Sequence, residues 1–217
     1  MTPSRALIFA NGSLPDLEAA RTLLRPADTL YAADGGTRHL LALGRLPSLV
    51  IGDLDSTPPE ELERLQAAGV PLRRYPRDKN ETDLELALAA AVADGHGEIL
   101  IVGGLGGRLD QSLANLALLT APSLAGLDLR LDDGVEEAFF VRGRAGVRGR
   151  PGEIVSLLPW GGLAVGVTTS GLRWPLSNET LHPERSRGVS NELTGTAAEV
   201  ALRSGLLLVV HRRALQP

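Results

Sequence analysis

The sequence predicts two domains: an open, mostly parallel α/β sheet with helices on both faces, followed by a small all-β sandwich or barrel. Two patterns support this. Up to residue 131, short apolar runs alternate with helical periodicity, which is typical of βα units in a Rossmann-like sheet. From about residue 135, short apolar runs are separated by glycine-rich turns, which favours antiparallel strands. We therefore place the domains at residues 1–134 and 135–217.

Composition limits the classes of protein to consider. The chain has 217 residues, 43% of them hydrophobic, which is enough to form sizeable cores. It has no cysteine, which excludes disulfides and thiol catalysis. The net charge of −4 gives no basic footprint, so we do not expect nucleic acid as a partner. No apolar run is long enough to span a membrane, and the start lacks the apolar segment of a signal peptide, so we expect a cytoplasmic protein without a membrane partner.

Apolar runs rich in Leu, Ile, Val and Ala predict the strands of the first domain. These runs are Ala6–Ala10, Leu30–Ala33, Leu49–Ile51, Ile99–Val102 and Leu127–Leu131. The short run Leu72–Tyr75, which contains two arginines, is taken as a further strand. Apolar residues at helical spacing predict the helices between them. The helices are expected around Asp16–Leu24, Arg38–Leu43 and Pro59–Ala68, along Leu84, Leu88 and Val92 as far as Gly95, and along Leu109, Leu113 and Leu116.

The second domain shows shorter apolar runs and no helical pattern. Its strands are expected at Phe139–Val141, Glu153–Leu158, Leu163–Thr169, Ala198–Leu202 and Leu206–His211. The domain boundary falls near residues 132–150, where glycines are mixed with arginines. The segment 143–150 within it receives no assignment from its sequence.

The segment Gly52–Thr57 follows a buried apolar strand and carries two carboxylates, Asp53 and Asp55. On an extended chain these two side chains would lie on the same side, with Cα atoms about 6–7 Å apart. They could then converge on one Mg²⁺, whose oxygen ligands lie on the order of 2 Å away. The alternative is a solvated turn before Pro58-Pro59.

The segment Asp78–Asp83 lies between a strand and a helix. One interpretation is a helix cap, with Asn80 as the N-cap and Asp83 three residues later. The functional interpretation adds Asp78 or Asp83 to the Mg²⁺ carboxylates and makes Lys79, the only lysine of the chain, a point charge for a phosphate. The two interpretations are compatible.

A glycine-rich loop, Gly103–Gly107, follows another strand and opens a helix, where backbone N–H groups favour an anion. Arg108 would add a fork-shaped donor for phosphate. Leu109 breaks the dinucleotide-binding fingerprint, and the Gly-Lys of a P-loop is absent from the sequence. Asp110 is either a first-turn helix acid or a group for a second substrate.

Related motifs end two further strands, at Asn11-Gly12 and at Asp34-Gly35-Gly36. Ordinary turns also favour Gly, Asn and Asp, so each motif alone means little. The carboxyl ends of parallel strands, however, share one edge, where such sheets bind ligands. Together the motifs predict Mg²⁺-carboxylate chemistry on a polyphosphate, either phosphoryl or pyrophosphoryl transfer or hydrolysis.

The order and spacing of these motifs resemble those of thiamine pyrophosphokinases. The motifs are Ala33–Gly36, Gly52–Ser56, Asp78-Lys79-x-x-Thr82-Asp83 and Gly103–Gln111, and the segments Gly171–Leu176 and Ser190–Glu192 resemble the thiamine-binding part of that family. The resemblance covers nearly the whole chain. Bacterial members commonly have His where this chain has Gln111, so we assign Gln111 no proton-transfer role.

The resemblance implies that ATP gives its diphosphoryl group to the hydroxyl of thiamine, leaving AMP and thiamine diphosphate. By position, the implied Mg²⁺ ligands are Asp53, Asp55 and Asp83. The implied ATP-binding residues are Asn11, Asp34, Gly35, Gly36, Lys79, Thr82, Gly106, Gly107 and Arg108. The implied thiamine-binding residues are Asp110, Gln111, Trp174, Ser190 and Asn191. The resemblance also implies a homodimer with thiamine at the subunit interface, where Trp174 would stack on it.

Several alternatives stay open. Trp174 could be a core or interface aromatic, and Ser190-Asn191 a turn. The general base could be Asp110 or Asp78. A pyrophosphokinase for another small alcohol, such as a hydroxymethyl pterin, would need a different second domain, and Trp174 with Ser190-Asn191 argues against it. A non-catalytic nucleotide or thiamine sensor would not need the full set of carboxylates.

Overall fold

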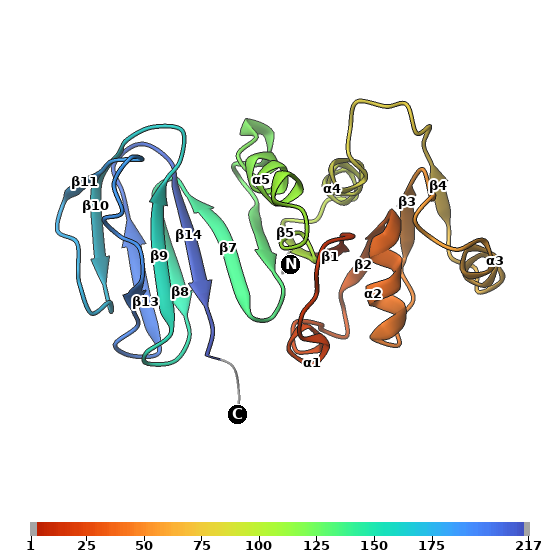
Figure 1. Cartoon of the computed structure of the whole chain (residues 1–217), viewed down its shortest axis with the longest axis horizontal. Helices are drawn as coiled ribbons and strands as arrows, with labels where there is room; N and C mark the ends of the chain where they lie inside the picture. Colours follow the sequence, from red (N-terminus) through yellow and green to blue (C-terminus); the bar gives the residue numbers. More distant parts are fainter. Residues whose placement is uncertain (1–3, 215–217) are drawn as a thin grey trace. The chain divides into compact units, whose positions relative to one another are not determined.

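The computed structural model describes residues 4–214 and consists of two compact units, residues 1–134 and 135–217 (Figure 1). The first unit contains a six-stranded parallel sheet in the order β6-β5-β1-β2-β3-β4. Its strands are β1 (Arg5–Phe9), β2 (Thr29–Ala33), β3 (Leu49–Gly52), β4 (Leu72–Arg74), β5 (Glu98–Val102) and β6 (Asp128–Asp132). The predicted parallel sheet is confirmed, with each strand close to its expected position.

Helices cover both faces of this sheet, as the sequence predicts (Figure 1). They are α1 (Leu17–Arg21), α2 (Thr37–Ala42), α3 (Pro59–Ala67), α4 (Asp83–Ala93) and α5 (Leu109–Leu118), with short 3₁₀ turns η1 (Asp34–Gly36) and η2 (Pro122–Leu124). Leu40 of α2 and Leu65 of α3 join Phe9 of β1 in one apolar core. On the other face, α4 packs against β1, β2 and β3 through its buried residues Leu84 and Leu88.

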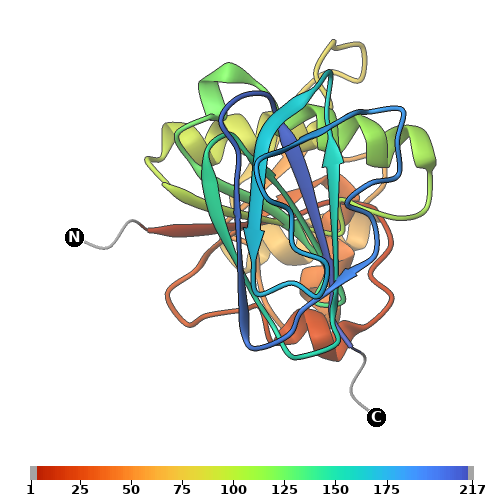
Figure 2. The same cartoon turned by 90° about the vertical axis from the view of Figure 1, so that its left-hand side faces the viewer.

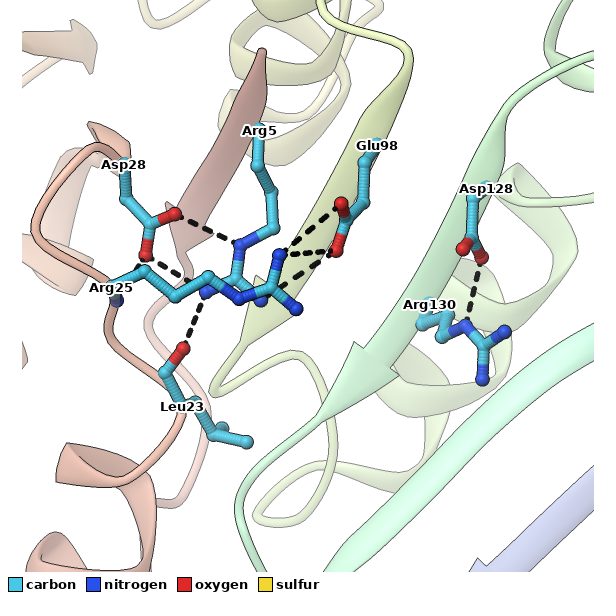
Figure 3. Close-up of polar contacts among 7 residues, drawn as sticks. All are labelled: Arg5, Leu23, Arg25, Asp28, Glu98, Asp128 and Arg130. Carbon is cyan, nitrogen blue, oxygen red and sulfur yellow. Dashed lines mark hydrogen bonds and ion pairs between the residues drawn. The ribbon is translucent and has the colours of Figure 1, made fainter. Parts of the chain in front are cut away.

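Polar contacts, of which the one between Arg5 and Asp28 is buried, tie the amino-terminal ends of the strands together. Arg5, at the start of β1, donates to both carboxylate oxygens of Asp28, at 2.9 and 2.8 Å, and to the carbonyl of Leu23 (Figure 3). The Asp28 side chain is 1% exposed. Glu98, at the start of β5, pairs with Arg25 at 3.1 Å. These contacts fix the chain before β2 against the sheet, and the opposite edge is left for the loops that carry the motifs.

The second unit is an antiparallel β sandwich, whose strands are coloured from green-blue to blue in Figure 2. Its strands are β7 (Glu136–Val141), β8 (Arg144–Arg148), β9 (Ile154–Pro159), β10 (Ala164–Ser170), β11 (Glu179–Leu181), β12 (Asn191–Glu192), β13 (Ala197–Ala201) and β14 (Leu207–Arg212). β12, β9, β14 and β7 are neighbours in one layer, and β11, β10, β13 and β8 form the other. A core that includes Leu157 and Val209 from one layer and Val167 and Val200 from the other fills the space between them.

The segment without an assignment, residues 143–150, contributes strand β8, which pairs with β13 from Arg144↔Ala201 to Arg148↔Ala197. Only Val147 of this strand is buried, and its arginines are exposed. One apolar residue is too weak a pattern to predict a strand, and the pairing partner lies about 50 residues away in sequence. Among the helices of residues 4–214, none is both long and apolar enough to cross a membrane.

Candidate active site

A cavity of about 580 Å³ lies at the carboxyl edge of the parallel sheet. The loops after β1 and β5 meet there, where Gly12 N donates to Gly103 O at 2.8 Å. The helices that follow these loops, α1 and α5, lie on opposite faces of the sheet (Figure 1), and open α/β sheets bind ligands at such a point. The predicted site residues that line it are Asn11, Asp34, Asp53, Asp55, Lys79, Thr82, Asp83, Gly106, Gly107, Arg108 and Gln111. Gly35, Gly36, Asp78 and Asp110 are not among its lining residues.

Three carboxylates meet inside this cavity, and we call them the carboxylate cluster: Asp34, Asp53 and Asp83. One oxygen of each lies within 4.8 Å of an oxygen of the others. They come from three loops, because Asp34 follows β2, Asp53 follows β3 and Asp83 begins α4. Three carboxylates this close repel one another unless a cation lies between them. The cluster is therefore a candidate site for a divalent cation.

The expected geometry of Asp53 and Asp55 is wrong. The backbone between them is not extended, because Leu54 adopts a left-handed φ of +63°. The carboxylate of Asp55 consequently turns toward Ser56 Oγ, at 3.2 Å, and Arg77 Nε, at 3.6 Å. Asp34, which the sequence assigned to the nucleotide, takes the third place in the cluster. The assignment of Asp55 to a metal stays a prediction.

Lys79 lies beside the carboxylate cluster, with its side chain only 10% exposed. Its Nζ is 3.0 Å from Asp83 Oδ1 and 3.9 Å from Asp53 Oδ2. Burial alone would lower the pKa of Lys79, but Asp83, Asp53 and Asp34 outweigh it and hold this pKa above its usual value. The ammonium is therefore a permanent positive charge in the cavity.

Asp83 is harder to ionise than an exposed aspartate, although Lys79 lies beside it. Burial, together with the charges of Asp53 and Asp34, raises the pKa of Asp83, although Lys79 acts in the opposite direction. Asp83 Oδ1 is buried and accepts no hydrogen bond of good geometry in the part of the chain that the structure describes. This buried oxygen already faces one cation, the ammonium of Lys79 at 3.0 Å, and a carboxylate oxygen in such a place is a ligand that Mg²⁺ could also use.

Asp34 is 4% exposed and is held by the loop after β3. Its Oδ2 accepts a hydrogen bond from the backbone N–H of Ser56, at 3.2 Å, and its Oδ1 one from Thr57 Oγ1, at 3.4 Å. Asp34 itself has a positive φ of +41°. Positive φ values at Asp34, in the cluster, and at Leu54, next to Asp53, are typical of a functional site.

The cap of α4 differs from the expectation. Thr82, not Asn80, is the N-cap, and its Oγ1 accepts a hydrogen bond from the backbone N–H of Glu85 at 3.2 Å. Asp83 is consequently the first residue of the helix, where the helix dipole favours a carboxylate. Sequence alone could not choose between two good capping residues two positions apart.

Arg108 and Asp110 lie at the start of α5, on the surface. Arg108 donates to Asp110 through Nε at 3.1 Å and through a terminal nitrogen at 2.5 Å. This bond lowers the pKa of Asp110, which makes its carboxylate a weak base. The structure thus pairs two residues that the sequence assigned to separate substrates.

Sequence reasoning missed several lining residues of the cavity, including Ser13, Arg38 and Asn115. Arg38 donates to the carbonyls of Asn11 and Gly12, at 3.0 and 3.2 Å, and so holds the first loop. Asn115 is buried and donates to the carbonyl of Gly104 at 2.7 Å. The sequence contains one signal that could have identified Asn115 as a site residue: it is a polar residue among the apolar residues of a helix.

A separate cavity of about 380 Å³ lies within the second unit. Two predicted residues, Trp174 and Asn191, line it together with Leu176, Ser186, Arg187, Gly188 and Val189. Trp174 is 47% exposed, which excludes the alternative of a core aromatic. Ser190 does not line the cavity and has a left-handed φ of +57°.

Comparison with protein families gives two matches along the chain. Residues 20–131 match the model "Thiamin pyrophosphokinase, catalytic domain", and residues 146–207 match "Thiamin pyrophosphokinase, vitamin B1 binding domain". The chain belongs to the thiamin pyrophosphokinase family. The two matches fall in the first and second unit respectively.

Comparison with individual members of the thiamin pyrophosphokinase family gives the same assignment. The thiamine pyrophosphokinase of Bacillus subtilis is 30% identical over 179 residues, which cover 82% of this chain and 84% of the relative. The crystal structure of a family protein from Enterococcus faecalis is 27% identical, with a TM-score of 0.82 over 98% of this chain and all of that one. The Bacillus subtilis crystal structure has a TM-score of 0.87 at 24% identity, over 98% and 100% of the two chains, and shows the fold. The family and the two-part fold predicted from the motifs are confirmed.

Proposed function

We propose that this chain transfers the diphosphoryl group of ATP to the hydroxyl of thiamine and releases AMP and thiamine diphosphate. The observation that carries the proposal is the meeting of Asp34, Asp53 and Asp83 within 4.8 Å, next to Lys79, in a member of this family. A cluster of negative charge beside one ammonium suits a substrate that brings both phosphates and a divalent cation.

The carboxylate cluster would hold Mg²⁺, and the buried oxygen of Asp83 supports this assignment. Mg²⁺, when bound, neutralises the charge that develops on the transferring phosphates. Protein contacts would hold Asp34 and Asp83 before any ligand arrives: Asp34 accepts hydrogen bonds from Ser56 and Thr57, and Asp83 pairs with Lys79 at 3.0 Å. Such preorganisation means that the site need not rearrange during the reaction.

Lys79 and the glycine-rich loop would bind the phosphates of ATP. Lys79 carries a fixed positive charge that points at the cluster, and the loop presents backbone N–H groups at the start of α5. Arg108 lines the same cavity and would contribute once a phosphate replaces Asp110 as its partner. Departure of Arg108 would also raise the pKa of Asp110 toward its ordinary value, which keeps Asp110 open as the general base.

Trp174 would contact thiamine. Its half-exposed indole lines the cavity of the second unit, and a flat cationic ring system suits an indole face. The predicted homodimer also remains a proposal. It is supported by α5, on which Leu109 and Leu113 are 73% and 49% exposed, since a helix with an uncovered apolar face favours burial against a partner. The cytoplasmic location likewise stays a prediction.

The test is to incubate the protein with ATP, Mg²⁺ and thiamine and to separate the products by chromatography. We expect AMP and thiamine diphosphate in equal amounts, and a large loss of both in Asp53→Asn. ADP with thiamine monophosphate would contradict diphosphoryl transfer. Formation of AMP from a hydroxymethyl pterin and not from thiamine would favour the other alcohol, and binding of thiamine without turnover would favour a sensor.

A further inference from the structure

The side chain of Asn191 does not point freely into the cavity of the second unit but binds the backbone of Trp174. Its Oδ1 accepts a hydrogen bond from Trp174 N at 3.0 Å, and its Nδ2 donates one to Trp174 O at 2.7 Å. Oδ1 also accepts from the backbone N–H of Glu192 at 2.9 Å. The residue is 4% exposed.

These bonds determine the orientation of the carboxamide. A flipped amide would place Nδ2 against two N–H donors and Oδ1 against a carbonyl, which no hydrogen bond could satisfy. Both lone pairs of Oδ1 and one N–H of Nδ2 are therefore used within the protein. Little of the hydrogen-bonding capacity of Asn191 is left for a ligand.

The pairing of the two segments explains why a side chain makes these bonds. Leu172 and Leu193 form an antiparallel bridge, and Arg173 N donates to Glu192 O at 2.9 Å. Continued by one residue, this register places Trp174 opposite Asn191. The backbone of Asn191, however, pairs with Val155 of β9 on its other side. Because Arg173 and Glu192 are a hydrogen-bonded pair, the ladder leaves Trp174 and Asn191 without backbone hydrogen bonds to each other, and the carboxamide of Asn191 bonds Trp174 N and O instead.

Neighbouring groups hold the indole as well. The guanidinium carbon of Arg173 lies 4.9 Å from the centre of the Trp174 ring, and Arg173 pairs with Glu192 at 2.8 Å. Arg173 does not line the cavity. One face of the indole is thus covered by an arginine that is itself held in place, and the cavity opens elsewhere on the ring.

We propose that Asn191 is a positioning residue: it fixes the backbone of Trp174, and through it the indole against which thiamine binds, and it is not the group that recognises the aminopyrimidine. This inference rests on the proposed function, because it takes Trp174 as a thiamine contact. It revises the direct substrate role that the family resemblance implied for Asn191.

The test is a double-mutant cycle between Asn191→Ala and Trp174→Ala, read as kcat and as KM for thiamine and for ATP. We expect each single variant to raise the KM for thiamine by roughly 3- to 30-fold. The KM for ATP should stay within about 2-fold of wild type. Because Asn191 acts through Trp174, the double variant should bind thiamine no worse than Trp174→Ala alone.

A second readout follows Trp174 directly. In a Trp160→Phe background Trp174 is the only tryptophan, so its fluorescence reports the indole. We expect Asn191→Ala to increase quenching by acrylamide, since the indole is no longer held. If Asn191→Ala fails to fold, Asn191→Asp is used in its place. It keeps the shape of the side chain and the acceptor oxygen but places a second oxygen against the Trp174 carbonyl, so it should also increase quenching. Asn178→Gly, an exposed asparagine of the same unit, is the matched control and should change neither readout.

Additive effects in the cycle would overturn the proposal, because they would mean that Asn191 contacts thiamine independently. Unchanged quenching in a folded Asn191 variant would overturn it as well. Failure of the wild type to form thiamine diphosphate would instead contradict the proposed function, and the quenching experiment would still decide whether Asn191 holds Trp174.

Discussion

A Cβ atom on Gly52 would lie 2.9 Å from Cγ of Asp83 and 2.9 Å from Cβ of Asp34. Gly52 ends β3 with a φ of +151°, a conformation that residues with side chains rarely adopt. Asp34 and Asp83 can therefore lie close together only because Gly52, which lies between them, has no side chain.

Gly52→Ala should therefore push Asp34 and Asp83 apart and lower kcat/KM for AMP formation on the order of 100-fold. The matched control is Gly69→Ala, which also has a positive φ, of +79°, but has nothing within 4 Å of its added Cβ. The control should lose about 1 kcal/mol of stability and keep its activity. Rates of AMP formation and thermal unfolding of both variants are the measurements, and a fully active Gly52→Ala would show that the close approach is unnecessary.

Substitutions at Asp34 and at Asp55 should differ in their effect on metal binding. Asp34 lies in the carboxylate cluster, whereas Asp55 turns toward Ser56 and Arg77. We expect Asp34→Asn to weaken the binding of Mn²⁺, used as a paramagnetic substitute for Mg²⁺, by roughly ten-fold or more. Asp55→Asn should have the smaller effect. Titration followed by electron paramagnetic resonance measures both affinities without turnover, and the reverse order would contradict the cluster as the metal site.

The buried ion pair at the other edge of the sheet should matter for stability and not for activity. Asp28→Asn leaves the buried Arg5 with only its longer ion pair to Glu98, at 3.7 Å, so we expect a loss of about 2–4 kcal/mol in the free energy of unfolding. Asp128→Asn removes the more exposed bond between Asp128 and Arg130 (Figure 3), and should cost less than about 1 kcal/mol. Urea unfolding followed by circular dichroism compares the two; equal losses would mean that burial of the Arg5–Asp28 pair is irrelevant.

Glu153 should make the stability of the second unit depend on pH. It accepts hydrogen bonds from Arg150 N, His211 Nε2 and Ala214 N, at 3.0, 2.9 and 3.2 Å. Burial alone would raise the pKa of Glu153, but these bonds outweigh it and hold this pKa below its ordinary value of 4.5. The carboxylate therefore stabilises the fold fully above pH 4.5, and this contribution is lost as the pH falls through the lowered pKa.

Glu153→Gln should accordingly lower the free energy of unfolding by about 1–3 kcal/mol near pH 6 and make its fall toward pH 3 shallower. Both tryptophans lie in the second unit, so urea unfolding followed by tryptophan fluorescence reports this unit. Glu184→Gln, which changes an exposed carboxylate, is the control. An unchanged pH dependence in Glu153→Gln would assign the acid sensitivity to other groups.

The sequence by itself determined the fold class, the family and most of the cavity. Hydrophobic periodicity is local, so the runs at Leu7, Val50 and Ile101 predicted buried parallel strands before any contact was known. Parallel strands place their carboxyl ends at one edge, so motifs far apart along the chain could be assigned to one site.

Only the tertiary structure decided which groups meet there. The left-handed turn at Leu54 moves Asp55 away and leaves the third place to Asp34, and backbone dihedrals of single residues do not follow from residue type. The choice of Thr82 as helix cap, the pairing of β8 with a strand distant in sequence, and the hydrogen bonds from Asn191 to Trp174 all depend on contacts between separate segments. Such contacts are set by packing of the whole unit, whereas a sequence pattern records only local preference.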